Sequence, residues 1–191
     1  MLGFRLCHRR YAWAAAALAF LLAAALLPAA PAKAGRGDCR DHSRLPAKTS
    51  IAKLRQAVTC LINRRRTAHG LRQLRVSPQL QRAARGHSRS MVRNDFFSHY
   101  GRGGRSFIDR IRHSGYLAGA NSWTLGEVIA AGSGRWATAR NIISAWMHSP
   151  AHRVEVLSGH FHDFGVGVAR GVPGAGRRGA TYTVDFGARD G

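Results

Sequence analysis

Three side chains in the sequence have the chemistry and the setting of a polar binding site, and the first is Glu127. It is one of two glutamates in the chain and lies in an otherwise apolar stretch, residues 123–129. Because burying an isolated charge is very costly, a carboxylate here must be paired, hydrogen-bonded or at the edge of a cleft. Two interpretations stay open: a functional carboxylate, with general base as its candidate role, or a structural one that accepts backbone N–H groups or an arginine.

The other two side chains are histidines beside predicted helix ends. His99 closes the segment 94–99 at a helix-to-loop junction, where binding residues are common. His152 follows Ser149-Pro150, a pair that typically begins a helix, so it should lie in the first helical turn. His148 stands four residues before His152, but Pro150 intervenes and the His-Glu-x-x-His zinc signature is absent. Taken singly, each histidine is more often a satisfied polar residue than a metal ligand.

Helices predicted from apolar periodicity must position these residues. The first helix runs from a cap at Thr49 or Ser50 to Ala68, before the stop signal Gly70. Ser77-Pro78 begins a second, whose buried stripe is Leu80, Ala83, Ala84, His87 and Met91. Two further helices are expected at residues 107–113 and 136–147.

The remaining elements predict a small sheet between these helices. Residues 164–169 and 181–186 alternate in the manner of strands, with a hairpin loop at 171–180 and a third strand near 124–129. Helices that flank such a sheet indicate an α+β fold.

The first 34 residues have the features of a secretory signal peptide. Basic residues precede an apolar run, 12–27, and the tripeptide Ala32-Lys33-Ala34 follows it. We expect cleavage after Ala34, then an extended arm at 35–48 and the domain at 49–191, in a protein that is secreted or periplasmic. The alternative is an uncleaved anchor, although the run is shorter than the ~20 residues that a spanning helix needs.

Export would leave the mature chain with two cysteines, Cys39 and Cys60. In an oxidising compartment two cysteines favour one disulfide, which would join the arm to the first helix. The alternative is two unpaired thiols, with Cys60 packed in the core. Two thiols alone exclude a zinc site made of cysteines only.

The chain is strongly basic, and most of its positive charge is arginine. Removing the four basic residues of the leader from the total of +21 leaves +17. Such a charge draws a protein to anionic envelope polymers or lipid headgroups, although it also fits an arginine-rich genome and a solvated surface. No motif supports specific recognition of nucleic acid.

A series of motifs, in order and spacing, resembles the CAP (SCP) domain of cysteine-rich secretory, antigen 5 and pathogenesis-related proteins and their bacterial relatives. The resemblance covers residues 55–187. Its motifs are Cys60-Leu-Ile-Asn63 with Arg66 and Gly70-Leu71, Ala84 with His87-Ser88 and Met91, Asp95-Phe-Phe-Ser-His99, Arg110-Ile111 with Gly115-Tyr116, Gly126-Glu127, Trp146-Met147 with Ser149-Pro150 and His152-Arg153, Gly165-Val-Gly-Val168, and Tyr182-Thr183 with Asp185-Phe-Gly187.

The resemblance implies a three-layer α-β-α sandwich, with a small, largely antiparallel central sheet and a shallow cleft. The family's two histidines map onto His99 and His152, and one acidic residue maps onto Glu127. The second acidic position falls on Ser149. Val128 and Val184 replace the family's Asn and Gln, which weakens any activity that needs two carboxylates or those amides.

Three functions follow as hypotheses. The first is a monomeric, non-enzymatic binding module for a lipid or an anionic envelope ligand, with peripheral membrane contact as one option. The second is a zinc-dependent hydrolase in which His99 and His152 hold Zn²⁺ and Glu127 is the general base. Because catalytic zinc sites usually have three protein ligands, we expect this zinc to be weakly bound and exchangeable. The third is electrostatic adhesion without a working cleft.

Overall fold

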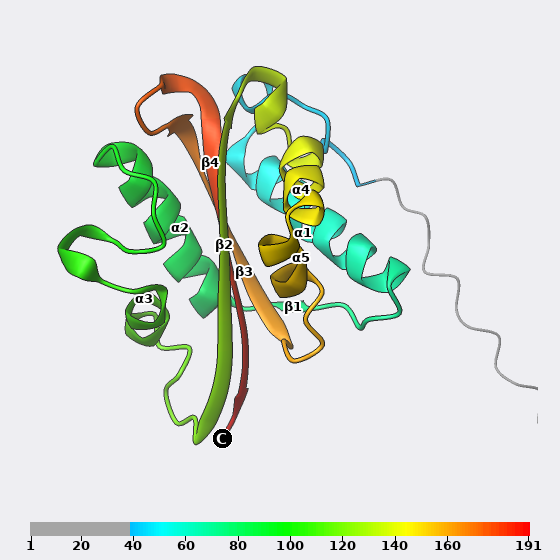
Figure 1. The fold of residues 1–191 in the computed structure, drawn as a ribbon, viewed down its shortest axis with the longest axis vertical. Helices are drawn as coiled ribbons and strands as arrows, with labels where there is room; N and C mark the ends of the chain where they lie inside the picture. Colours follow the sequence, from blue (N-terminus) through cyan, green and yellow to red (C-terminus); the bar gives the residue numbers. More distant parts are fainter. Residues whose placement is uncertain (1–38) are drawn as a thin grey trace, which may run out of the picture. The chain divides into compact units, whose positions relative to one another are not determined.

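A four-stranded sheet forms the centre of the domain, in the order β1-β3-β4-β2. Its strands are β1 (Arg75–Val76), β2 (Ser122–Ser133), β3 (Asp163–Val172) and β4 (Gly176–Asp190). β1 pairs in parallel with β3, whereas β4 pairs antiparallel with both β3 and β2. The computed structural model describes residues 39–191 (Figure 1), so the predicted signal peptide and its cleavage site at Ala34 lie outside the described residues.

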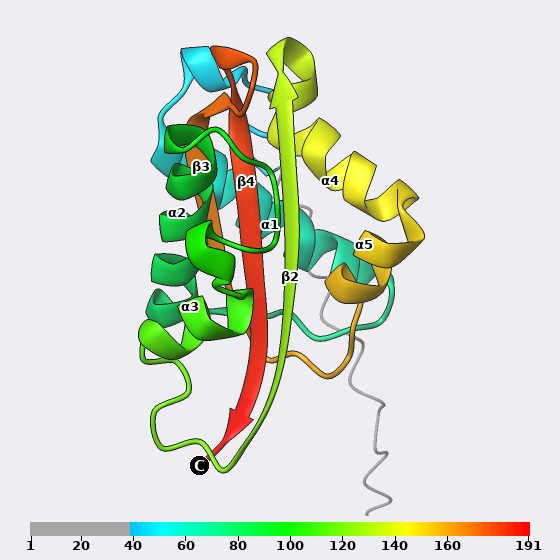
Figure 2. The same cartoon turned by 60° about the vertical axis from the view of Figure 1, so that its left-hand side comes forward.

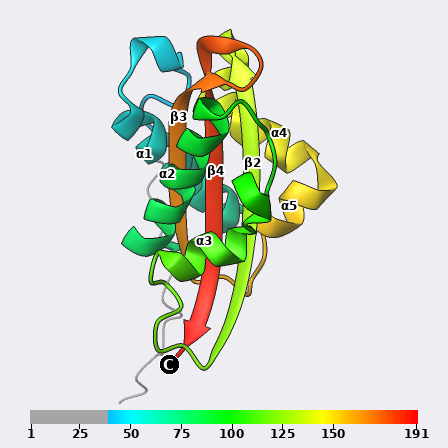
Figure 3. The ribbon, with the colours of Figure 1, turned by 90° about the vertical axis from the view of Figure 1, so that its left-hand side faces the viewer.

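Helices cover both faces of the sheet, as expected for an α-β-α sandwich. α1 (Ile51–Ala68), α4 (Ala139–His148) and α5 (Pro150–Val156) lie on one face. α2 (Pro78–Arg93) and α3 (Phe107–His113) lie on the other (Figures 2 and 3). Within residues 39–191 no helix has both the length and the apolar character that crossing a bilayer requires.

Side-chain alternation along β3 and β4 gives the sheet two unlike faces. The large apolar side chains of both strands point toward α1, α4 and α5 and form the main core. On that face Phe186 stacks on Phe161 and Phe164, with ring centroids 5.3 and 6.4 Å apart. The α2 face has small residues on β3 instead. A Cβ added at Gly165 or Gly167 would come within 2.0 or 2.1 Å of the α2 backbone.

Hydroxyl caps set the helix starts. Ser50 accepts a hydrogen bond from Lys53 N, which decides between the two predicted caps of α1. Ser77 caps α2 in the same way. The predicted helix 136–147 begins too early: residues 134–137 form a 3₁₀ turn, η3, and α4 begins at Ala139. The reason is Thr138, which has extended backbone angles and whose hydroxyl accepts a bond from Asn141 N.

The strands are longer than predicted, and the hairpin loop is shorter. β3 continues to Val172 and β4 begins at Gly176, so most of the predicted loop 171–180 belongs to the ladder. These Gly- and Arg-rich residues carry no apolar alternation, but backbone pairing needs none. The two-residue β1 is too short to leave a pattern in the sequence.

The arm before α1 is fixed to the domain at both ends. Cys39 and Cys60 form a disulfide with an S–S distance of 1.99 Å. Arg170 of β3 donates hydrogen bonds to the carbonyls of Pro46 and Thr49. The described part of the arm is not wholly extended, because residues 46–48 form a 3₁₀ turn, η1. A disulfide that closes a loop of this length stabilises a fold by about 3 kcal/mol.

Candidate functional site

Glu127 is held by two partners at the edge strand β2. His99 Nδ1 lies 2.8 Å from Oε1, and Arg110 Nη2 donates to Oε2 at 2.6 Å. The Glu127 side chain is only 1% exposed, whereas that of His99 is 45% exposed. Burial alone would raise the pKa of Glu127, but the bonds from His99 and Arg110 outweigh burial and lower it. Glu127 is therefore a paired carboxylate that orients an accessible imidazole.

Arg110 links the loop that carries His99 to helix α3. Its Nη1 donates to the carbonyls of His99, at 2.9 Å, and Arg105, at 3.2 Å. Ser106 begins α3 with a reciprocal capping box, which fixes the first turn of this helix. Sequence reasoning quoted Arg110 only as part of a motif and gave it no role. The sequence did indicate that Glu127 could be paired with an arginine, but it did not indicate which arginine.

Two buried titratable groups lie on the same face of the sheet. His87 of α2 is 1% exposed and donates from Nε2 to Ser98 O at 2.8 Å, which supports the loop just before His99. Burial lowers the pKa of His87 and favours its neutral form. The predicted apolar stripe of α2 had placed His87 inside, but as packing rather than as a support of the site.

Asp185 of β4 faces Glu127 directly across the strand pair. It is fully buried, and an ionised Asp185 finds no hydrogen-bond donor among residues 39–191. Burial and the charge of Glu127 raise its pKa well above the ordinary value, which favours the protonated form. Sequence reasoning missed this role, although an acid between Val184 and Phe186 in an alternating strand was a signal for it.

His152 and Ser149 approach from the opposite side of β2. Ser149 Oγ lies 2.9 Å from His152 Nδ1, at the start of α5. Burial lowers the pKa of His152, and the charge of His99 lowers it further, which places the two imidazoles within electrostatic reach. No hydrogen bond within residues 39–191 joins the His99–Glu127 pair to the Ser149–His152 pair.

Gly126 makes room for a fifth polar residue of this region. A Cβ at Gly126 would lie 2.2 Å from Glu155 Oε2. Burial raises the pKa of Glu155, and the positive charge of His99 acts in the opposite direction. Glu155 of α5 therefore belongs to the electrostatic surroundings of His99. The Gly126-Glu127 motif thus places the carboxylate of Glu127 on β2 and leaves space for the carboxylate of Glu155 against the backbone of Gly126.

Comparisons with known proteins decide the family. The profile of the cysteine-rich secretory protein family, CAP, matches residues 60–186, more than half of the chain. The chain belongs to the CAP family. It is 30% identical over 128 residues to the Bacillus subtilis protein YkwD. The aligned region covers 67% of this chain and 47% of YkwD. The chain thus spans about half the length of this curated relative.

Solved structures have the same fold. An extracellular protein containing an SCP domain from Bacillus anthracis matches with a TM-score of 0.54 and 26% identity, over 72% of this chain and 43% of that one. An outer surface protein of Borrelia burgdorferi matches with a TM-score of 0.61 and 17% identity, over 74% of this chain and 97% of that one. At that identity the Borrelia protein is evidence for the fold alone.

The groups at the candidate site that could contact a metal ion are the two imidazoles of His99 and His152. In the part of the chain that the structure describes, no three His, Cys, Asp or Glu side chains form a group that could hold a metal ion. His99 and His152 are each hydrogen-bonded through Nδ1, and neither Nε2 has a partner within residues 39–191. Metal-binding histidines commonly bind through one ring nitrogen while the other is hydrogen-bonded, and each of these imidazoles has that hydrogen-bonding arrangement.

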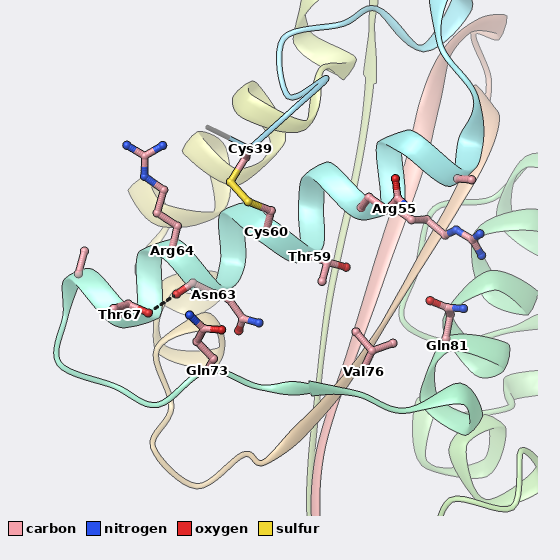
Figure 4. A pocket seen from close by; sticks show the side chains of 13 residues that line it. Cys39, Arg55, Thr59, Cys60, Asn63, Arg64, Thr67, Gln73, Val76 and Gln81 are labelled. Carbon is pink, nitrogen blue, oxygen red and sulfur yellow. Dashed lines mark hydrogen bonds between the residues drawn. A yellow bond between two sulfur atoms is a disulfide. The ribbon is translucent and has the colours of Figure 1, made fainter. Parts of the chain in front are cut away.

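The site is not the largest hollow of the CAP domain. A groove of about 750 Å³ runs along α1 and β1 (Figure 4), and none of the four predicted cleft residues lines it. The site at β2 is distinguished by its chemistry rather than by its volume. At this site the side chain of His99 is 45% exposed and therefore accessible to solvent.

Proposed function

We propose that this CAP protein is exported and acts as a non-enzymatic binding module. Its cleft at His99, Glu127, Ser149 and His152 receives a lipid or another ligand of the cell envelope. The observation that carries the proposal is that two imidazoles are each fixed through Nδ1, beside an accessible surface, with Nε2 left for a ligand. Export is supported by the predicted leader and by the similarity to the extracellular SCP-domain protein of Bacillus anthracis.

We further propose that the cleft binds Zn²⁺ weakly. Nε2 of His99 and of His152 would hold the ion, while Glu127 and Ser149 orient the two rings. Bound zinc supplies a Lewis acid and lowers the pKa of bound water. With two protein ligands the ion should exchange readily.

The zinc-dependent hydrolase is the weaker alternative, because Glu127 is poorly placed to act as general base. Both of its oxygens are already hydrogen-bonded, and the side chain is almost completely buried. Accepting a proton from water would require Glu127 to give up a bond to His99 or Arg110. A role in orienting His99 fits these contacts better.

Calorimetric titration of the purified protein with zinc tests the proposed site. His99→Ala and His152→Ala should each weaken binding about tenfold or more, in line with the removal of one of two ligands. His148→Ala is the matched control, because His148 is exposed and bonds only within α4, to Ser144. Unchanged affinity in both cleft variants would remove the metal from the proposal.

Zinc affinity should also depend on pH, because only neutral imidazoles bind the ion. We expect affinity to fall below pH ~6, as the rings take up protons. The lowered pKa of His152 keeps this ring neutral to a lower pH than a free histidine. Affinity that does not change between pH 5 and 7 would contradict the assignment of these ligands.

Binding of envelope components separates the cleft from simple charge attraction. The protein should be offered envelope lipid vesicles, peptidoglycan and anionic polymers at low and high salt. Simple attraction weakens steeply with ionic strength, whereas a neutral lipid in the cleft should hardly respond. Loss of all binding at high salt would favour electrostatic adhesion over the cleft.

A further inference from the structure

The groove along α1 is preformed and distant from the cleft residues. Its walls are one side of α1, the segment that leads through β1, and the start of α2 (Figure 4). Asn63 holds two of these walls together: its Nδ2 donates to Leu74 O at 3.0 Å, and its Oδ1 accepts from Leu74 N at 2.8 Å. This pair of bonds imitates strand pairing and fixes the width of the groove.

One end of the groove carries positive charge with no acidic partner. Arg55 extends from α1 toward α2 (Figure 4), where it meets the field of Arg85. Its Nε and Nη1 are shielded from solvent and have no hydrogen-bond partner within residues 39–191. Burial lowers the pKa of Arg55, and the charge of Arg85 lowers it further. A partly buried guanidinium beside a second arginine lacks the anion that would offset its desolvation.

Besides Arg55 and Arg64, the groove offers neutral hydrogen-bonding groups. Gln56, Gln73 and Gln81 line it, and their amides make no hydrogen bond to the described part of the chain. Each amide has two donors and an acceptor, which suits hydroxyl groups. Val76, 49% exposed, adds an apolar contact beside them. No aspartate or glutamate lines the groove, so nothing there repels an anion.

We propose that this groove is a second binding site, for an oxyanion carried on a hydroxyl-bearing chain. Arg55 binds the phosphate or carboxylate group, the nearby charge of Arg85 adds to the attraction, and the three glutamine amides bind hydroxyls along the chain. Both polyol phosphodiesters and acidic sugars present this chemistry. The site extends the binding role proposed above to another surface, and it shares no residue with the His99–His152 cleft. Failure at either site leaves the other open.

Titration of the full chain with three defined probes tests the groove. The probes are an oligo(glycerol phosphate), an oligogalacturonate and a neutral dextran oligomer of similar length. We expect one or both charged probes to bind and the neutral one to bind at least tenfold more weakly. Which charged probe binds identifies the oxyanion. Equal binding of all three probes, or no binding of either charged probe, would overturn the proposal.

Two variants and one control separate the groove from general charge. Arg55→Gln should lower the affinity for the charged probe about tenfold, the effect expected when a charge-assisted hydrogen bond is lost. Ala52→Phe keeps every charge but fills the groove one turn from Arg55, and should weaken binding similarly. Arg153→Gln on α5 removes the same charge from an exposed position outside the groove, and should change affinity less than twofold. Equal losses in Arg55→Gln and Arg153→Gln, or no loss in Ala52→Phe, would refute a defined site.

Discussion

The two faces of the central sheet are built by opposite means. On the face toward α1, α4 and α5, large apolar side chains interlock in a continuous core. On the face toward α2 and α3, glycines let the helix backbone approach, and a small apolar cluster around Leu80 and Ile111 lies beside buried polar groups such as Glu127, Asp185 and Thr183. The first face obtains its stability from buried apolar area, whereas on the second the hydrogen bonds of buried polar groups add to a smaller apolar contribution.

This difference teaches where the fold tolerates change. An apolar core loses stability in proportion to the atoms removed, and neighbouring side chains relax in part. A close-packed polar layer cannot relax in this way. A lost partner leaves a buried charge, and an added methyl meets backbone. We therefore expect the largest effects of small substitutions on the α2 face.

Arg110→Met should give the largest effect, because it removes the cationic partner of a carboxylate that is 1% exposed. We expect a loss of about 3–5 kcal/mol in the free energy of unfolding, measured by urea denaturation. Arg112→Met is the matched control on the same helix, since its pair with Asp109 is exposed and should contribute little to stability. The double variant Arg110→Met/Glu127→Gln should be more stable than Arg110→Met alone. If it is not, the lost pair does not explain the effect.

Gly165→Ala should give the next largest effect. Its new Cβ would lie 2.0 Å from Gln81 N, and α2 would have to move away from β3. We expect a loss of about 3 kcal/mol, seen as a lower urea midpoint. Gly86→Ala, on α2 with open space around its Cβ, should instead stabilise by up to ~1 kcal/mol. Similar results for both variants would mean that the interlayer distance is not fixed by the glycine.

Asp185→Asn should give the smallest effect and one that depends on pH. Because the pKa of Asp185 is raised in the folded protein, this residue does not destabilise the fold at low pH. It destabilises the fold increasingly as the pH rises above its pKa in the unfolded chain, near 3.8. The free energy of unfolding of Asp185→Asn should therefore equal that of the wild type near pH 3.5 and exceed it at pH 7 by about 1 kcal/mol or more. A difference in unfolding free energy that is constant from pH 3.5 to 7 would show that Asp185 does not hold the raised pKa.

The fold was largely predictable from the sequence, because helix caps and apolar periodicity act locally. Ser50 and Ser77 mark real helix starts, and residues 107–113 form the predicted third helix. The errors occur where backbone pairing, rather than side-chain pattern, extends an element. β2 reaches Ser133 and β4 begins at Gly176 for this reason.

The contacts of the candidate site could not be predicted from the sequence. The family motifs pointed to His99, Glu127, Ser149 and His152, and the structure bonds them in two pairs. No local pattern shows that Arg110 bonds to Glu127 across 17 positions, or that Asp185 faces Glu127 across two strands. Such long-range partners depend on strand register, which the sequence specifies only through the whole sheet.

The arm before α1 is held by a disulfide, which a reductant can open, and by hydrogen bonds that it cannot, including one from Arg140 N to the carbonyl of His42. Thiol exchange would release Cys39 from Cys60, while Arg170 would still donate hydrogen bonds to the carbonyls of Pro46 and Thr49. The disulfide and the Arg170 hydrogen bonds involve none of the residues that hold the His99–Glu127 pair, in which Glu127 belongs to β2 and its other partner, Arg110, to α3. Transfer of the protein to a reducing environment should therefore free Cys39, while the arm stays bonded to Arg140 at His42 and the His99–Glu127 pair stays intact.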